Sequence, residues 1–375
     1  MRQQAAESGH HKRNMFIGIP RLQLLLIFIV SLAIFSTGCN IVKKEGKTPT
    51  LLKTEDAAKA DLLKEVNRFA SVNSMRAKMD LKFEDNSFAQ FGNKEVYRAA
   101  DGEVVVQRPA KIRLTVQVPV IKTDVAQMTS DGENFRVAIL QDGGSGKYKK
   151  FVKGTNNADY SKLQKALNSS EGGNGKEVSQ NVNAFANLRP QHFTDAMLVR
   201  PVDPANVYTH STIFQVEEDE TQPAKSPLRK VVRGYYLLDE FAKDADGDLK
   251  ITRRFWFDRV GGIRLARQQI FDKAGEIESD IMYGREGNLS DKAEFKNLPL
   301  RIQVTRPKEK YTMSLTYQVP EAVSIGKTYP EGAFVLENTW NLEEVDLDKK
   351  LRESSAANPP AENSNKNVNA VTRFQ

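Results

Sequence analysis

Several segments of the 375-residue chain alternate between apolar and polar residues, and this period of two constrains the fold more than any other feature. In the first of them, residues 75–83, apolar side chains stand at every second position and charged ones stand between them. Successive side chains of a strand point to opposite faces of a sheet, so the pattern predicts a strand with one apolar and one charged face. The same alternation returns in residues 112–118 and 135–139.

The second half of the chain repeats the pattern in longer segments that turn residues separate. We expect strands over residues 250–258, 263–271, 277–283, 299–305 and 311–318. No alternation of strand and helix runs through the chain, which disfavours a parallel nucleotide-binding sheet. The sequence therefore predicts a mainly β (α+β) fold, built as a long antiparallel meander that is curved enough to enclose an interior.

Two helical segments accompany the expected strands. Thr54, followed by two acidic residues, is typical of a helix start. Leu62, Val66 and Phe69 then repeat at helical spacing, which predicts a helix of about four turns with one apolar face. A second, short helix is expected near residues 190–198, where a proline fits the first turn.

The N-terminus carries a basic segment, then a short apolar run, then the only cysteine of the chain, Cys39. As a helix, residues 22–35 would reach about 21 Å, which is less than the roughly 30 Å of a hydrocarbon core, so a membrane span is disfavoured. This order of residues is typical of a secretory signal. Its end, Ser36-Thr-Gly-Cys39, resembles a bacterial lipoprotein signal, in which the cysteine is lipidated and becomes the first mature residue.

Two other interpretations of the N-terminus stay open: an ordinary signal peptide with an incidental cysteine, and an uncleaved anchor. A lipidated Cys39 with two or more acyl chains would hold the protein stably on a membrane. The residue after the cysteine is Asn40, whereas an Asp at this position would resemble an inner-membrane retention signal. Asn40 therefore favours a location at the outer membrane, with the protein facing the periplasm. The chain then has four parts: a signal peptide at 1–38, the lipidated cysteine and a tether at 39–53, a β domain at 54–345 with an inserted segment at 141–206, and a disordered tail at 346–375.

Charge and cysteine content disfavour several classes of function. Residues 1–38 hold four of the 55 Lys and Arg and one of the 48 Asp and Glu, so without them the net charge falls from +7 to +4. This small, dispersed excess gives no support to a nucleic-acid role. A single cysteine excludes a disulfide framework and a cysteine-rich metal site. His192 and His210 follow the signal, and neither stands in a metal-ligand spacing, so no metal or cofactor is expected.

The chain carries no recognised catalytic motif. The acidic segment 244–248 lacks the later Gly and Glu of a calcium loop, and segment 143–147 lacks the first Gly and the hydroxyl of a phosphate loop, so both are interpreted as turns. Neighbouring carboxylates such as Glu217 and Glu218 would point to opposite faces of a strand. We therefore predict that the protein is not an enzyme. An enzyme whose carboxylates come together from distant strands is the third hypothesis, after the two functions given below.

The segment 104–114, Val-Val-Val-Gln-Arg-Pro-Ala-Lys-Ile-Arg-Leu, resembles the lipoprotein localisation factors LolA and LolB. In that family a strand that ends in Arg-Pro is followed by one with an Arg among alternating apolar residues, and a Ser-Asp-Gly turn, here at 130–132, introduces a later strand. The helix and charged strand expected over residues 54–84 stand in the same order as in the family. The segments 298–302 and 332–334 are similar to its closing region.

The resemblance implies an incomplete barrel with helices over its mouth, which holds the acyl chains of a lipoprotein in an apolar cavity. Like LolB, and unlike the soluble carrier LolA, this chain carries an expected anchor of its own. The candidates for the lid are Leu62, Val66 and Phe69 of the first helix and, by position in the family, Arg113. The candidates for the cavity lining are Met75, Met79, Leu81, Ile112, Leu114, Val116, Phe135 and Val137.

We therefore expect a lipid-anchored periplasmic protein that binds acyl chains of lipoproteins or other lipids for transport or insertion at the outer membrane. Its partners would be the membrane, the bound lipid and a periplasmic carrier protein. The alternative is a structural envelope lipoprotein whose curved sheet is a scaffold for protein partners. A continuous apolar cavity would favour the carrier, whereas a packed core would favour the scaffold.

Lipidation can be tested on the N-terminal peptide of the mature protein. In a bacterium that processes lipoproteins, we expect the mass of this peptide to include a diacyl group and an amide-linked chain on Cys39. The Cys39→Ser variant should lose both, because it lacks the thiol, and should be recovered without detergent. An unmodified Cys39 in membrane-bound protein would contradict the prediction.

Overall fold

A computed structural model describes residues 48–85, 95–118, 122–141, 149–158, 160, 189–284, 289, 298–318 and 323–357. The chain divides into residues 1–48 and 49–375, and the fold below is that of the second unit. Cys39, the expected signal and most of the tether lie outside the described residues. Among the helices of the described part, none is long and apolar enough to cross a membrane.

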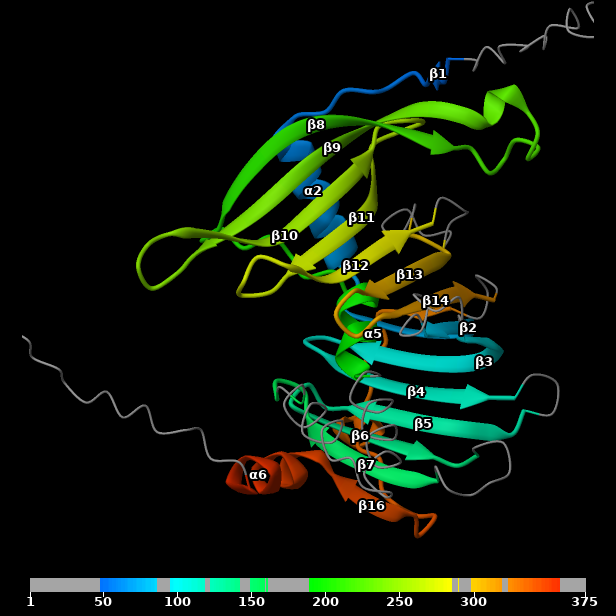
Figure 1. The fold of residues 1–375 in the computed structure, drawn as a ribbon, viewed down its shortest axis with the longest axis vertical. Coiled ribbons are helices and arrows are strands. Elements are labelled where there is room, and N and C mark those ends of the chain that lie inside the picture. The colour runs from blue at the N-terminus through cyan, green and yellow to red at the C-terminus, as the bar shows by residue number, and fades with distance from the viewer. Residues whose placement is uncertain are drawn as a thin grey trace, which may run out of the picture. The chain divides into compact units, whose positions relative to one another are not determined.

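One sheet of sixteen strands, counted over the described residues, dominates the fold (Figure 1). The strands follow the order β1-β9-β10-β11-β12-β13-β14-β2-β3-β4-β5-β6-β7-β16, with β8 beside β9 and β15 beside β2. Neighbours are antiparallel, except that β1 runs parallel to β9 and β16 runs parallel to β7. The first and last strands of this order do not pair with each other. The predicted class, mainly β with an antiparallel sheet that does not close, is therefore confirmed.

The strands have these bounds: β1 Thr50–Leu51, β2 Ser74–Asp85, β3 Glu95–Gln107, β4 Lys111–Gln117, β5 Asp124–Ser130, β6 Asn134–Ile139, β7 Lys150–Thr155, β8 Val207–Glu218, β9 Lys230–Lys243, β10 Leu249–Asp258, β11 Arg264–Phe271, β12 Ile277–Tyr283, β13 Arg301–Arg306, β14 Tyr311–Tyr317, β15 Ser324–Ile325 and β16 Glu343–Asp346. The strands that alternation predicted agree with these bounds to within two residues. Alternation did not single out β3, β5, β7, β8 and β9, nor the short β1, β15 and β16. Both faces of β9 are covered, with Tyr235 in a cluster on one face and Tyr236 in the core on the other, so no apolar and polar alternation marks it.

The helices are α2 Lys59–Ala70, α5 Pro190–Met197 and α6 Leu347–Ala357. α2 begins four residues later than the sequence predicted, with Ala58 and not Thr54 as its N-cap, and Asp56, the second of the two expected acids, makes another contact. The buried guanidinium of Arg259 donates to Asp56 Oδ1 at 2.5 Å, and Glu55 N donates to the Arg259 carbonyl at 2.8 Å. Asp61 supports the actual start, since its carboxylate accepts from Ala58 N at 3.0 Å.

α6 occupies the start of the segment that was expected to be disordered, so that expectation is wrong for residues 347–357. Leu347 is fully buried in the main core, and the Asp348 carboxylate accepts hydrogen bonds from Thr155 Oγ1 at 2.7 Å and Tyr160 Oη at 2.5 Å. The parallel pairing of β16 with β7 brings these groups together. The composition of the tail, which is mostly polar, cannot indicate such long-range contacts. Residues 358–375 lie outside the described part of the chain.

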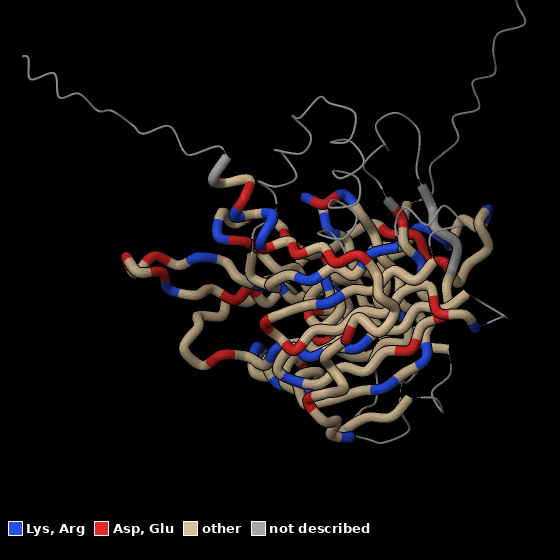
Figure 2. Tube along the Cα trace, turned by 90° about the horizontal axis from the view of Figure 1, so that it is seen from below, with Lys and Arg blue, Asp and Glu red and all other residues tan. Residues whose placement is uncertain are grey.

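One face of the sheet, called here the inner face, carries the main hydrophobic core, and α2 and α5 both pack on it. Leu62 and Val66 of α2 and Phe193 of α5 belong to the same buried cluster as strand residues from both halves of the chain. The opposite, outer face holds the smaller cluster of Tyr235, Trp256 and Ala266. Figure 2 shows Lys and Arg interspersed with Asp and Glu along the described trace, in keeping with the low net charge.

The density of the core can be tested at Leu114, which is 1% exposed in β4. Leu114→Ala should lower the free energy of unfolding by about 2–5 kcal/mol, because it leaves a cavity among well-packed neighbours. Leu249→Ala, at a position that is 50% exposed, should change it by less than about 0.5 kcal/mol. Urea unfolding of the two variants measures both values. Equal, small effects would show that the interior has spare room at Leu114.

Candidate functional site

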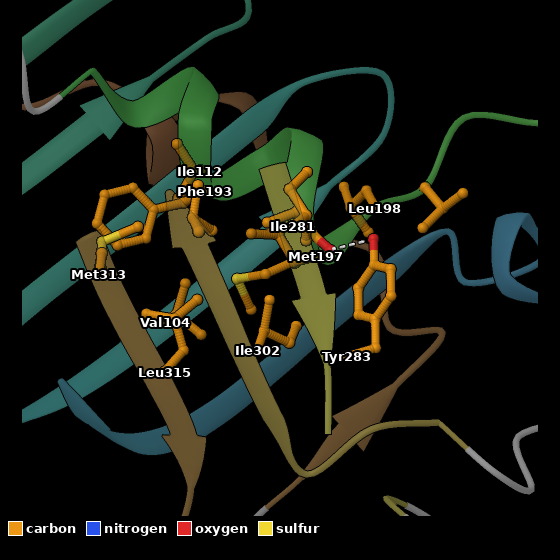
Figure 3. Close-up of a cluster of buried hydrophobic side chains, with 14 of the residues drawn as sticks. Val104, Ile112, Phe193, Met197, Leu198, Ile281, Tyr283, Ile302, Met313 and Leu315 are labelled. Carbon is orange, nitrogen blue, oxygen red and sulfur yellow. Dashed lines mark hydrogen bonds between the residues drawn. The ribbon is translucent and has the colours of Figure 1, made fainter. Parts of the chain in front are cut away.

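α5 lies across the inner face where the two halves of the sheet meet. It contacts β4 and β5 of the first half and β13 of the second. Figure 3 shows Phe193 and Met197 extending from α5 among side chains of these strands. The surrounding residues are at most 2% exposed and come from four strands, β3, β4, β13 and β14: Val104, Ile112, Ile302 and Leu315. The helix therefore covers apolar surface that would otherwise face solvent.

The sequence of α5 explains why it forms here and not on its own. It has eight residues, a proline in the first turn and no side-chain cap at Arg189. Isolated helices of this length are marginal in water, so helicity here depends on packing. Six of the eight residues are buried, namely Pro190, His192, Phe193, Thr194, Ala196 and Met197.

A row of buried polar side chains crosses the inner face beside α5. The guanidinium of Arg253 on β10 forms a 2.5 Å salt bridge with Glu240 on β9 and donates to the carbonyls of Arg200 and Pro201. The guanidinium of Arg306 on β13 donates to Ser279 Oγ on β12 at 2.6 Å. Because buried charges are costly without partners, these bonds fix the segment that follows α5 against the sheet.

The polar side of α5 faces this row. His192 Nδ1 is hydrogen-bonded to the hydroxyl of Tyr311, the neighbour of Arg306 across β13 and β14. Burial raises the pKa of Asp195, against the opposing effect of Arg200. The hydroxyl of Tyr283 donates to the Ala196 carbonyl at 3.2 Å, the bond drawn dashed in Figure 3. His192 thus packs in the interior.

A small apolar cavity lies where the end of α2 meets the end of α5. Its volume is about 20 Å³, close to what one water-sized probe occupies and far below the roughly 300–1,000 Å³ of small-molecule pockets. In the described part of the chain, the inner face is therefore packed in this conformation. The cavity is lined by Phe69, Val72, Met75, Ala196, Met197, Tyr283, Leu289, Leu298, Pro299, Ile302 and Tyr317.

Of the residues predicted to line a cavity, Met75 lines this one. Met79, Ile112, Leu114, Phe135 and Val137 are buried in the main core, and Leu81 and Val116 are partly buried against it. Of the predicted lid residues, Phe69 reaches the cavity. Leu62 and Val66 are buried on the same helix, in the same core cluster.

Arg113, the fourth lid candidate, is exposed, and its neighbours Ile112 and Leu114 point to the inner face, so its own side chain is on the outer face. Arg108, in contrast, contacts the segments that directly follow the two covering helices. Its guanidinium donates to the carbonyl of Val72, just after α2, at 3.0 Å, and to that of Val199, just after α5, at 2.7 Å. Arg108 thus joins the ends of both helices.

Sequence reasoning missed the polar row and the role of Arg108. A signal for the row exists, since Arg253 stands in phase with Phe255 and Phe257, and Arg306 with Val304, which places these arginines on the apolar face. No comparable signal marks Arg108, because its partners are backbone carbonyls of segments distant in sequence.

Comparison with known proteins gives similarity to solved structures alone, since no family model and no curated protein matches the chain. A LolA superfamily protein from Nitrosomonas europaea is 10% identical, with a TM-score of 0.38 over 75% of this chain and 99% of that one. A domain from Vibrio parahaemolyticus, described as an outer membrane lipoprotein-sorting protein domain, is 9% identical, with a TM-score of 0.34 over 73% and 94% of the two chains.

A third similar structure, a protein of the DUF1329 family from Desulfovibrio piger, is 11% identical, with a TM-score of 0.38 over 76% of this chain and 99% of that one. The superfamily named for the first structure is the one that the sequence motifs resemble. At these low scores, the function of the chain has to be argued from its own residues.

The burial of Asp195, and with it the packing of α5 on the inner face, can be tested by substitution of this residue. Its folded-state pKa is raised above the unfolded value of about 3.9, so the folded state binds this proton more tightly. Ionisation of Asp195 therefore costs stability at neutral pH, and that cost disappears as the pH falls toward about 4. Asp195→Asn should raise the melting temperature at pH 7, with the gain shrinking on acidification. The exposed Asp246→Asn is the control, and equal behaviour of the two variants would contradict the assignment.

Proposed function

We propose that the protein is a lipid-anchored envelope protein that holds acyl chains of a lipoprotein or another lipid against the inner face of its sheet, in the place that α5 occupies. One observation carries the proposal: a short helix without a side-chain cap covers the apolar junction of an open sheet. A covering element of this kind can leave without breaking any strand pairing.

Burial of the α5 side chains and burial of an acyl chain at the same place would contribute comparable free energies, which suits reversible binding. Full burial of a large apolar side chain contributes about 1.5–3 kcal/mol, so Phe193, Met197 and Leu198 together contribute about 5–9 kcal/mol. An acyl segment of about ten methylenes would contribute about 8 kcal/mol at the same site. Met75 and Met197 line the cavity beside α5, and their unbranched side chains adapt readily to a new neighbour.

Arg108 couples the two helices that cover the inner face. Because its guanidinium donates to the carbonyls of Val72 and Val199, withdrawal of α5 breaks one of these two Arg108 bonds and frees donor capacity beside the end of α2. The cavity lies at this same boundary, with Phe69 and Val72 on one side and Met197 on the other. An acyl chain would therefore enter between α2 and α5.

Location and partners follow from the N-terminal signal. In this proposal Cys39 carries the lipid anchor, the domain faces the periplasm from the outer membrane, and a periplasmic carrier protein delivers or collects the ligand. The support is the order of basic, apolar and small residues before the single cysteine.

The packed interior favours a second candidate, a structural envelope lipoprotein that is a scaffold for protein partners. A cavity of about 20 Å³ holds no acyl chain unless α5 moves. In this candidate α5 is a permanent part of the core, and the exposed outer face is the functional surface.

Binding of a fluorescent fatty-acid probe to the Cys39→Ser chain, purified without detergent, distinguishes the two candidates. Phe193→Ala should tighten binding by about tenfold, or about 1.4 kcal/mol, because it weakens the competing contacts of α5. Phe151→Ala is the matched control, since both rings are 4% exposed but Phe151 packs in a separate cluster. Both variants should lose about 3–5 kcal/mol of stability, so binding is measured below both melting temperatures.

Mass spectrometry of organic extracts from the same Cys39→Ser protein gives an independent result. The carrier should retain lipid from its host, and the scaffold should not. Lipid-free extracts, together with no probe binding by either the parent chain or Phe193→Ala, would refute the carrier.

A further inference from the structure

At one end of the sheet, β1 and β8 flank β9 and present an exposed apolar patch, formed by Leu51 on β1 and by Phe214 and Val216 on β8. Their exposed fractions are 66%, 52% and 61%. Leu51 and Val216 pair with the same residue of β9, Val232, from its two sides, and Phe214 pairs with Gly234, two residues further on. Cross-strand partners share a face, so the three side chains lie together.

The patch lies on the inner face, beyond the part that α2 covers. Tyr236 and Leu238 continue the same alternation along β9 and are buried in the main core. The side chains that bury Tyr236 and Leu238 do not extend to the patch, although the Phe214 ring packs directly against Gly234. A Cβ on Gly234 would stand 3.0 Å from Phe214 Cε1 and 2.7 Å from Thr54 Cγ2, so a side chain at 234 would displace that ring.

Exposed clusters of large apolar side chains mark interaction sites in soluble domains. Here the position of the patch in the chain indicates the partner. Leu51 is twelve positions after Cys39, and an extended chain spans at most about 3.6 Å per residue, or about 43 Å in all. A lipid anchor at Cys39 would therefore keep Leu51 within about 43 Å of the bilayer surface, which lets the patch reach it.

Basic residues accompany the patch, while of the two exposed acids that follow it in the chain, Glu55 and Asp56, the second is paired with Arg259. The tether contains Lys43, Lys44 and Lys47 against one acid, and each basic residue near an anionic surface adds attraction. Lys53 and Lys230 are exposed next to the patch. The carboxylate of Glu218, which stands in the same alternation as Val216, is paired with Arg229 at 2.8 Å. The acids of the hairpin connection, at 219 and 220, lie past the end of β8.

We infer that Leu51, Phe214 and Val216 insert into the surface of the membrane that holds the Cys39 lipid. This inference rests on the proposed anchor for proximity and adds the face of the domain that meets lipid. Docked in this way, the inner face with α2 and α5 turns toward the bilayer. The ligand then passes between membrane and binding site over a short path.

A single fluorescent label tests the contact in the lipidated full-length chain. Because Cys39 is acylated, Val216→Cys offers the only free thiol for a polarity-sensitive dye. In vesicles of phosphatidylethanolamine and phosphatidylglycerol, we expect its emission to shift to the blue and nitroxide-labelled lipids to quench it. Met282→Cys is the control, since Met282 is 52% exposed and pairs with Arg267 away from the patch. Equal emission at both sites, without quenching, would overturn the inference.

A second measurement separates this inference from the anchor itself. For the unlipidated Cys39→Ser chain, Phe214→Glu should weaken binding to the same vesicles by about tenfold, and Met282→Glu should leave it unchanged. If the Cys39 peptide proves unmodified while Phe214→Glu still weakens binding, the anchor fails and the docking surface stands. If the label at 216 instead responds to protein density in the absence of lipid, the patch is an interface between two copies, and the inference is wrong.

Discussion

The pairing of β2 with β14 is the contact on which the rest of the structure depends. It sets Met79 beside Tyr317 and Leu81 beside Leu315, while the other edge of β2 pairs with β3. Strands from the two ends of the domain thereby form one continuous inner face. Each half alone would leave its apolar side open, and a short helix such as α5 can cover the junction only because both halves contribute to it.

The inner face of this sheet has an apolar part at the junction of the two halves and a polar part formed by the buried row, and α5 contacts both. Its apolar side replaces solvent over the junction, whereas His192 and Asp195 face the row that contains Arg253 and Arg306. A buried ion pair is costly to break, because the loss of one partner leaves an uncompensated buried charge. The polar row therefore fixes where α5 sits, and the apolar contacts determine how easily another apolar group can replace it.

β2 was predictable from the sequence because one of its faces meets water, so that charged residues alternate with buried ones. β9 was not predictable in this way, since both of its faces are covered. The start of α2 was not predictable either, because Arg259 binds Asp56, one of the two acids expected in its first turn. The position of Arg113 on the outer face follows from its place between Ile112 and Leu114. Whether the inner face encloses a cavity or a packed core depends on how α5 fits, and no local pattern records that.

The order of features along the inner face connects the proposed anchor to the proposed site. The exposed patch on β1 and β8 comes first, then α2 over the strands that follow, then the small cavity at Phe69 and Val72, and then α5 over the junction. A lipid that leaves a membrane at the patch would meet α2 before α5. A small cavity lies at the boundary between these helices, and Arg108 binds the backbone on both sides of it. An opening at this boundary would extend a space that already exists, so in the proposed function transfer of an acyl chain would begin there.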